Sequence, residues 1–514
     1  MNTERLKRLY DWHSIAGVVL GWFLFTVCLS GTLAVLHPEI NLWADPAVRG
    51  TTHGELAEPI DVLDNYITAH EAEGELDNFF IWLPKDTQPY YQVSGRIMDA
   101  DGNAEFQLDR FHAETGAPIA AKEDGLAYWV LNLHRHLMFD RTIGRALVGI
   151  SGIYMMVLIL TGILVHRKIL REMFTVRWTR SVHLKWKDAH NALGIWTLPF
   201  STMIAFTGAF LGVVVIVLPV VAFTAFKGDQ EAAIEIIIGE TSTPSGVEAP
   251  MQPALPAIRA MRSEGLNPER LGVHHWGNDN AEYHVYATTE DALVTYAEVQ
   301  VNAVTGARKT LDLTSDAYPD TVSGRVLAAL TPLHYGTYGG LPLKILYYAL
   351  GLGLSFMVAL GMLVWVERRL NGPIGNRSDA YYRTISRLNG GIMTGLGLAY
   401  AMAFYASRLA DPEQVNLDLI GTVFLGTWIA AAGYALTRKD ARRATVVLLG
   451  LTGIACVGLP VLDLLEGAPL TAATLTVNGL AFATGATLVT AAWRMRRRSA
   501  ELPALATQLQ QPGG

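Results

Sequence analysis

The chain has 514 residues, of which 51% are hydrophobic and 17% charged, and its formal net charge is −7. An apolar share this high points away from an ordinary soluble protein, and no nucleic-acid partner is expected for an acidic chain. The two cysteines, Cys28 and Cys456, both lie in apolar stretches, which excludes a disulfide framework, a cysteine metal site and iron–sulfur clusters held by four thiolates.

Eight uncharged apolar stretches follow one another along the chain. Each is near or above the roughly 20 residues that a helix needs to cross a bilayer. The pattern predicts a polytopic all-α membrane protein with about eight transmembrane helices in the lipid bilayer. Pro199 and Pro219 lie inside the third stretch and predict a kink there, or a helix that continues beyond the membrane. The stretches are residues 14–36, 146–165, 191–226, 345–366, 388–407, 419–437, 444–462 and 467–493.

Lysine and arginine collect after the even-numbered stretches. Residues 166–188, for example, hold seven basic side chains against two acidic ones. Because basic flanks of short loops stay on the cytoplasmic side, we expect a multi-pass protein of the bacterial inner membrane with both termini in the cytoplasm. The opposite side is acidic: residues 39–140 carry 19 Asp and Glu against 6 Lys and Arg, and residues 227–336 carry 15 against 7.

Each acidic outer segment starts with a helical stretch, 59–72 or 253–264, and continues with alternating runs typical of strands. We therefore expect two small α+β extracytoplasmic domains. The predicted organisation is an N-terminal tail and first span (1–37), a first outer domain (38–140), spans two and three with a basic loop (141–226), a second outer domain (227–337), span four with its loop (338–387), a four-helix membrane module (388–498) and a cytoplasmic tail (499–514).

The first 370 residues contain an internal repeat. The first and third spans both read His, Gly at +4, Ser or Thr at +17 and Gly at +18, starting from His13 and His190. The outer domains share a Thr-Gly-Ala sequence at 115–117 and 305–307, and each is followed by a Leu-His pair that ends in His134 or His334. The unit of helix, outer domain, histidine and helix therefore occurs twice.

Histidines at both membrane depths of a four-helix core are what b-type haem with two axial imidazoles requires. A single histidine at a helix end is more simply an interfacial residue, but the repeat favours His13 with His190 as the inner pair and His134 with His334 as the outer pair. His136 and His166 are weaker candidates, since His136 points to another helix face than His134 and His166 aligns with Trp365. A helix that crosses about 30 Å of hydrocarbon separates the pairs too far to share one iron, so two haems b are expected.

The chain resembles the PepSY-associated transmembrane helix proteins, which include iron-regulated membrane proteins and siderophore-iron reductases. The resemblance covers about residues 5–370. It implies PepSY-like outer domains and a haem-bearing reductase that passes electrons outward, in some members to ferric siderophores in the periplasm. The residues that carry it are LYDWH at 9–13, SGT at 30–32, LH at 133–134, GR at 144–145, DAH at 188–190, GIW at 194–196, TGA at 207–209, LHYG at 333–336 and the Thr-Gly pairs at 115–116 and 305–306.

The leading hypothesis is an oxidoreductase that reduces a periplasmic acceptor such as a ferric siderophore or another ferric chelate. Because no nucleotide or flavin motif is present, its electrons would come from a membrane quinol or a separate cytoplasmic reductase. The alternative is a non-enzymatic membrane protein whose PepSY-like domains bind a peptide, a protease or an envelope partner. A transporter that uses the last four spans is disfavoured, since residues 388–493 carry no charge at mid-membrane.

Overall fold

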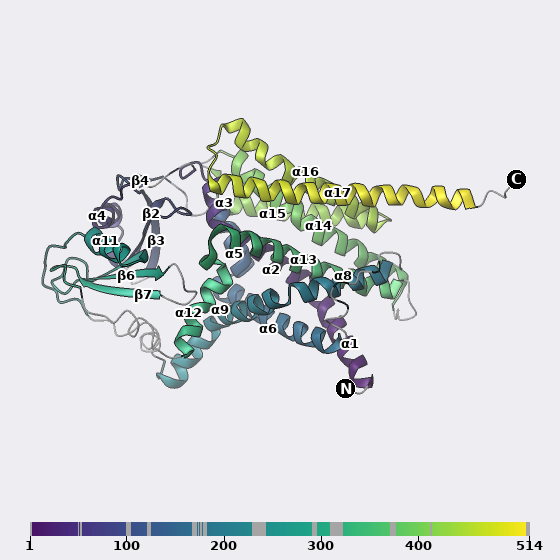
Figure 1. Cartoon of the computed structure of the whole chain (residues 1–514), viewed down its shortest axis with the longest axis horizontal. Helices are drawn as coiled ribbons and strands as arrows, with labels where there is room; N and C mark the ends of the chain where they lie inside the picture. The colour runs from purple at the N-terminus through teal and green to yellow at the C-terminus, as the bar shows by residue number, and fades with distance from the viewer. Residues whose placement is uncertain are drawn as a thin grey trace. The chain divides into compact units, whose positions relative to one another are not determined.

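The computed structural model describes residues 3–509 apart from 50, 52–53, 99–103, 121–124, 167–171, 173, 175–176, 178–181, 229–242, 290–295, 309–321, 371–376 and 412–413. It divides into two compact units (Figure 1). A helical unit comprises Met1–Ala44, Asp124–Val213 and Leu341–Gly514, and a sheet unit comprises Asp45–Glu123 and Val214–Gly340. Most of the basic loop expected at 166–188 lies outside the described residues.

Each apolar stretch predicted to cross the membrane is helical over most of its length. The helices are α1 (Thr3–Val19), α2 (Gly21–Ala34), α3 (His37–Ala44), α5 (Leu126–His136), α6 (Arg141–Val165), α8 (Val182–Trp196), α9 (Leu198–Ala225), α13 (Gly340–Leu370), α14 (Asp379–Leu409), α15 (Leu417–Thr437), α16 (Ala441–Glu466) and α17 (Ala472–Leu509). Within the described residues, six helices are long and apolar enough to span a membrane, or seven if the bent pair α1 and α2 counts as one span. The helix predicted as the fifth span, α14, is not among them.

The first predicted span is broken. Helices α1 and α2 meet at an angle of 65°. Leu20, which lies between them, leaves the helical region with φ −108° and ψ 9°. A side chain at Gly21 would collide with Met362 of α13, so glycine at this position lets α2 and α13 approach closely. The third predicted span is likewise divided at Thr197, and Pro199 stands in the first turn of α9, where a helix tolerates proline.

His134 lies in a separate helix and not in the second span. Leu137 and Met138 adopt positive φ values of 52° and 60°, which end α5 just after this histidine. The carboxylate of Asp140 then accepts hydrogen bonds from the backbone N–H groups of Thr142 and Ile143, and so caps the start of α6. His134 therefore projects from α5, a short helix that precedes the second span.

The last four helices do not have a core of their own. They pack on one another, but the same hydrophobic cluster contains side chains of α2, α3, α5 and α13. Two tryptophans of the N-terminal helices donate hydrogen bonds into this part of the unit, Trp22 to Asn389 at 2.8 Å and Trp43 to Asn478 at 3.0 Å. The module predicted at 388–498 is therefore built into the helical unit.

Buried charges also join these helices. The guanidinium of Arg408, in α14, lies 2.7 Å from the carboxylate of Asp463 in α16, with side-chain exposures of 1% and 7%. The same guanidinium donates to the carbonyl oxygen of Trp43 and lies 4.4 Å from the centroid of its ring. Lys344 and Glu39 form a second buried pair, 2.6 Å apart. Breaking such pairs singly is costly, because it leaves one buried charge without compensation.

The sheet unit contains one antiparallel sheet of seven strands in the order β4-β3-β2-β1-β5-β6-β7. The two segments predicted as separate α+β domains each supply half of it. The halves join where β1 pairs with β5, with Phe79 opposite Val273 and Trp82 opposite Arg270. The elements are α4 (Pro59–His70), β1 (Glu75–Trp82), β2 (Tyr90–Met98), β3 (Ala104–His112), β4 (Pro118–Ile119), α11 (Leu255–Ser263), β5 (Leu266–His274), β6 (Glu282–Thr289), β7 (Tyr296–Asn302), α12 (Val322–Tyr335) and the 3-10 turn η1 (Thr337–Gly339).

Equivalent contacts in the two halves confirm the predicted repeat. The hydroxyl of Tyr91 donates to the carbonyl oxygen of Ala57, just before α4, and that of Tyr283 donates to Gln252, just before α11. Both Thr-Gly turns adopt the same form, with φ of 66° at Gly116 and 71° at Gly306, a left-handed conformation that suits glycine. The repeat therefore extends to three-dimensional structure.

His70, at the end of α4, is held by two carboxylates. Its Nε2 lies 2.7 Å from Asp109 and its Nδ1 lies 3.1 Å from Glu73. Burial disfavours the charged imidazolium, but the two carboxylates outweigh this effect and raise the pKa of His70 above its usual value. The contact therefore ties α4 to β3 most strongly when the ring is protonated.

Candidate functional site

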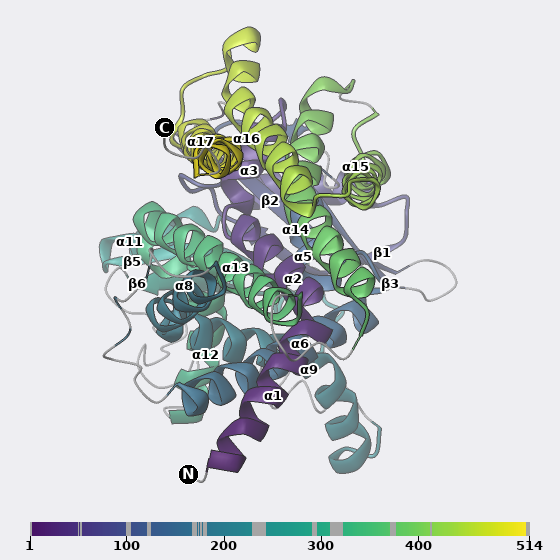
Figure 2. The same ribbon diagram turned by 90° about the vertical axis from the view of Figure 1, so that its right-hand side faces the viewer.

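His13 and His190, the predicted inner pair, lie together in the helical unit. Their ring centroids are 6.5 Å apart and the ring planes are inclined at 68°. Helix α1 contacts α6, and His190 of α8 reaches the backbone of α13, two helices that lie close in both views (Figures 1 and 2). Gly162 and Gly361 face the two rings, since a Cβ there would lie 3.3 Å and 3.1 Å from the Cε1 atoms of His13 and His190. Glycine at both positions makes room for the imidazoles.

The hydrogen bonds of His13 fix its tautomer. Its Nδ1 lies 3.0 Å from the Oγ1 of Thr161. That hydroxyl has one proton, which it donates to backbone carbonyls of its own helix, those of Val157 and Leu158. With its proton on these carbonyls, the Thr161 oxygen accepts from His13, which assigns the proton to Nδ1 and leaves the lone pair on Nε2.

His190 reaches the same state through a different partner. Its Nδ1 lies 2.8 Å from the carbonyl oxygen of Met357, which can only accept a hydrogen bond. Nε2 of His190 is then also unprotonated. A ring that donates from one nitrogen to a carbonyl or hydroxyl and keeps a lone pair on the other is the usual form of a metal-binding histidine.

The spacing of this pair fits haem iron. Two imidazoles bound on opposite sides of one metal at about 2.0 Å, with each ring centroid about 1.1 Å beyond its nitrogen, would have centroids about 6.2 Å apart. The observed 6.5 Å is close to that value. Among the described residues, no group of three or more His, Cys, Asp or Glu side chains is placed to hold a single metal ion, whereas haem needs only two protein ligands.

His134 repeats this pattern on α5. Its Nδ1 lies 3.1 Å from the carbonyl oxygen of Val27 and 3.2 Å from the hydroxyl of Ser30, which donates its own proton to Val27. Gly31 faces the ring, because a Cβ there would lie 2.8 Å from its Cε1. The Ser-Gly pair identified in the repeat thus positions His134, a role that the sequence did not reveal.

The other candidate histidines differ in placement. His334 lies in the last turn of α12, in the sheet unit, with its ring centroid 5.7 Å from that of Tyr335. The structure thus brings His13 and His190 together, while the pairing of His134 with His334 stays a prediction. His136 ends α5 and His166 follows α6, and the Nε2 of each is buried without a hydrogen-bond partner in the described part of the chain.

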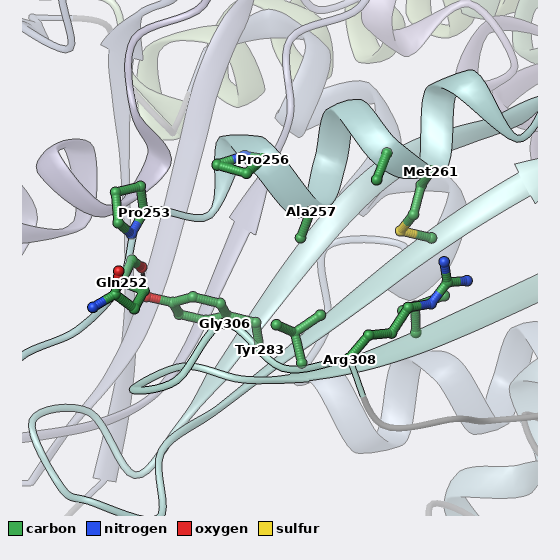
Figure 3. Close-up of a pocket in the computed structure, with 11 residues that line it drawn as sticks. Gln252, Pro253, Pro256, Ala257, Met261, Tyr283, Gly306 and Arg308 are labelled. Carbon is green, nitrogen blue, oxygen red and sulfur yellow. Dashed lines mark hydrogen bonds between the residues drawn. The ribbon is translucent and has the colours of Figure 1, made fainter.

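The sheet unit has a cavity of about 340 Å³ between α11 and strands β6 and β7 (Figure 3). Its lining is mostly apolar. The polar side chains at its edge are already bonded within the unit, Tyr283 to Gln252 at 2.6 Å and Arg308 to Glu264 at 2.6 Å. None of the six candidate histidines lines this cavity.

Sequence reasoning missed the groups that hold the rings. Thr161 and the Met357 carbonyl lie in helices far from their histidines along the chain, and only the three-dimensional arrangement relates them. Gly162 and Gly361 did carry a signal, since they occupy equivalent positions of the repeat.

The comparisons with known proteins agree with the repeat boundaries. The family described as "PepSY-associated TM region" matches residues 10–368. PA4219, an uncharacterized protein of Pseudomonas aeruginosa, is 29% identical over 346 residues, which cover 65% of this chain and 86% of the relative. Helices α14–α17 begin after the end of the family match.

Proposed function

Since the chain belongs to the PepSY-associated TM family, we propose that it is a haem-carrying reductase that passes electrons across the bacterial inner membrane to a periplasmic ferric chelate. The observation that supports this function best is the adjacent pair His13 and His190, each with a hydrogen bond at Nδ1 that leaves Nε2 for a metal. Haem would supply one-electron transfer at this position.

The chain's own residues would hold and insulate the inner haem. Thr161 and the Met357 carbonyl orient the imidazoles, and their hydrogen bonds make the rings better donors to a metal. An apolar cluster in the same unit, with Leu24, Met155 and Leu354 at its centre, limits access of water. A dry, apolar setting disfavours the extra charge of ferric iron and so raises the reduction potential.

The outer haem would use His134 and His334. His134 is oriented as a ligand by Val27 and Ser30, in the same way as the inner pair. The basic residues after the even-numbered spans support cytoplasmic termini and an outward direction of transfer. The donor would be a membrane quinol or a cytoplasmic reductase, and the acceptor a ferric siderophore or a similar chelate.

A visible spectrum of detergent-purified protein tests the proposal. Dithionite should give the reduced bands of b-type haem, and a pyridine haemochrome assay should give two haems per chain. His13→Ala and His190→Ala should each remove the same single haem. His183→Ala is the matched control, because it changes a histidine of the same helix α8 and should leave the haem content unchanged.

A colourless preparation from haem-replete cells would overturn this function. The PepSY-like unit would then be better explained as a binding module for a peptide, a protease or an envelope partner. Loss of different haems in His13→Ala and His190→Ala would overturn the pairing alone, and His166 would be the next ligand to test.

A further inference from the structure

The sheet has two different faces. Side chains alternate along a strand, so the residues next to Tyr91 and Tyr283, whose hydroxyls reach the segments that lead into α4 and α11, point to the opposite side. Register therefore places Phe80, Arg270 and Tyr286 together on the face away from these helices, at the junction of the two halves.

Arg270 lies between two aromatic rings on this face. Its guanidinium carbon is 4.9 Å from the centroid of Phe80 and 4.3 Å from that of Tyr286. Its Nε is buried without a hydrogen-bond partner, and no described carboxylate forms an ion pair with it, since the neighbouring Glu269 pairs with Lys85. The Nε itself is shielded by the rings, and the N–H donors of the terminal amino groups are the ones left for an external acceptor.

The surroundings of Arg270 add flat, polarisable groups. Trp82 stands opposite it on β1, with its ring centroid 6.2 Å from that of Phe80. Gly272 is buried at the centre of this face, where a Cβ would lie 3.5 Å from His274, Phe80 and Tyr286. A planar ligand would therefore stack on the half-buried rings of Phe80 and Trp82 and not on the Gly272 backbone.

We propose that this face binds an aromatic anion, namely a ferric chelate whose iron is held by the oxygen atoms of catecholate or phenolate groups. The guanidinium of Arg270 would bond the anionic oxygens, and Trp82 with Phe80 would stack on the aryl rings. The inference rests on the proposed function and narrows its acceptor. It also gives a role to an arginine that has no ion-pair partner among the described residues, in a segment where acidic residues outnumber basic ones, 15 to 7.

Binding can be measured without electron transfer. The probe is the gallium(III) complex of 2,3-dihydroxybenzoate, which is redox-inert, titrated into the full-length protein in detergent by calorimetry. Arg270→Ala should weaken binding by about tenfold to a hundredfold, the range for loss of a charge-assisted hydrogen bond. Arg270→Lys should fall between, because lysine keeps the charge and loses the planar, stacked donors.

Two controls separate this site from general effects. Arg259→Ala removes an exposed arginine of α11, on the helix-covered side of the sheet, and should leave affinity unchanged. The gallium(III) complex of a linear trihydroxamate, which has no aryl group and no negative charge, should bind at least tenfold more weakly than the aryl complex.

The outcomes distinguish this inference from the proposed function. Equal affinity for Arg270→Ala and the unchanged protein, with both retaining haem and the same thermal stability, would overturn the site, and so would equal binding of the two gallium complexes. A haem-containing protein that binds neither complex would refute the site and leave the reductase standing. A colourless protein with Arg270-dependent binding would support the site and refute the reductase.

Discussion

Replacing Thr161 with valine isolates the hydrogen bond that orients His13. Valine has nearly the shape of threonine but no hydroxyl, so the packing of α6 is kept while the contact to the His13 Nδ1 and the bonds to carbonyls of its own helix are lost. Leaving a partly buried N–H group without a hydrogen-bond acceptor costs about 1–3 kcal/mol. Removing an outer partner of a metal-bound histidine lowers affinity about 10- to 100-fold, which corresponds to about 1.4–2.7 kcal/mol. The cost of the lost hydrogen bond and the expected loss in haem-binding free energy therefore fall in the same range.

We therefore expect Thr161→Val to release the inner haem about 10- to 100-fold more readily when apomyoglobin is offered as a competing acceptor, and to change the midpoint potential of that haem alone. Thr161→Ser keeps the hydroxyl and should behave as the unchanged protein. Thr487→Val is the matched control, since among the described residues that hydroxyl bonds to a carbonyl of its own helix alone. If Thr161→Val retains haem within twofold of the unchanged protein, the role assigned to the Thr161–His13 contact is refuted.

Three further predictions concern packing, pH and space. Arg408→Met should destabilise the helical unit by about 3–5 kcal/mol because it removes the counter-ion of the buried Asp463 carboxylate, and Arg408→Met with Asp463→Leu should recover most of this loss in thermal unfolding. The raised pKa of His70 gives the folded protein stability that is complete below the usual value of 6.5 and is lost as the pH rises through the higher folded value. His70→Gln should therefore reduce the loss of thermal stability between pH 6 and pH 8.5. It should leave the rest of the pH profile unchanged. Gly361→Ala should lower haem occupancy because its Cβ crowds the imidazole of His190. Gly353→Ala in the same helix, where a Cβ makes only an ordinary contact, should not. Equal occupancy in both variants would contradict the assignment of His190 as a haem ligand.

Several features followed from the sequence because they depend on local chemistry. An apolar stretch of about 20 residues must be helical in a bilayer, where no water can satisfy its backbone groups, and the predicted spans are helical. The repeat predicted that His13 and His190 belong together, because duplicated segments fold alike and meet about a common axis. The Thr-Gly turns at Gly116 and Gly306 could also be predicted, since their left-handed backbone favours glycine.

Other features depend on contacts between distant segments, which no local pattern encodes. The strand runs predicted two outer domains, but only the pairing of β1 with β5 joins them in one sheet and creates the face around Arg270. The sequence predicted the last four spans as a separate module, yet Trp43 and Arg408 lie buried between the N-terminal and C-terminal helices. Residue type and spacing thus identified the inner histidine pair, whereas the tertiary structure alone decided which hydroxyl and carbonyl fix the protons on its rings, because each of those partners lies more than a hundred residues away.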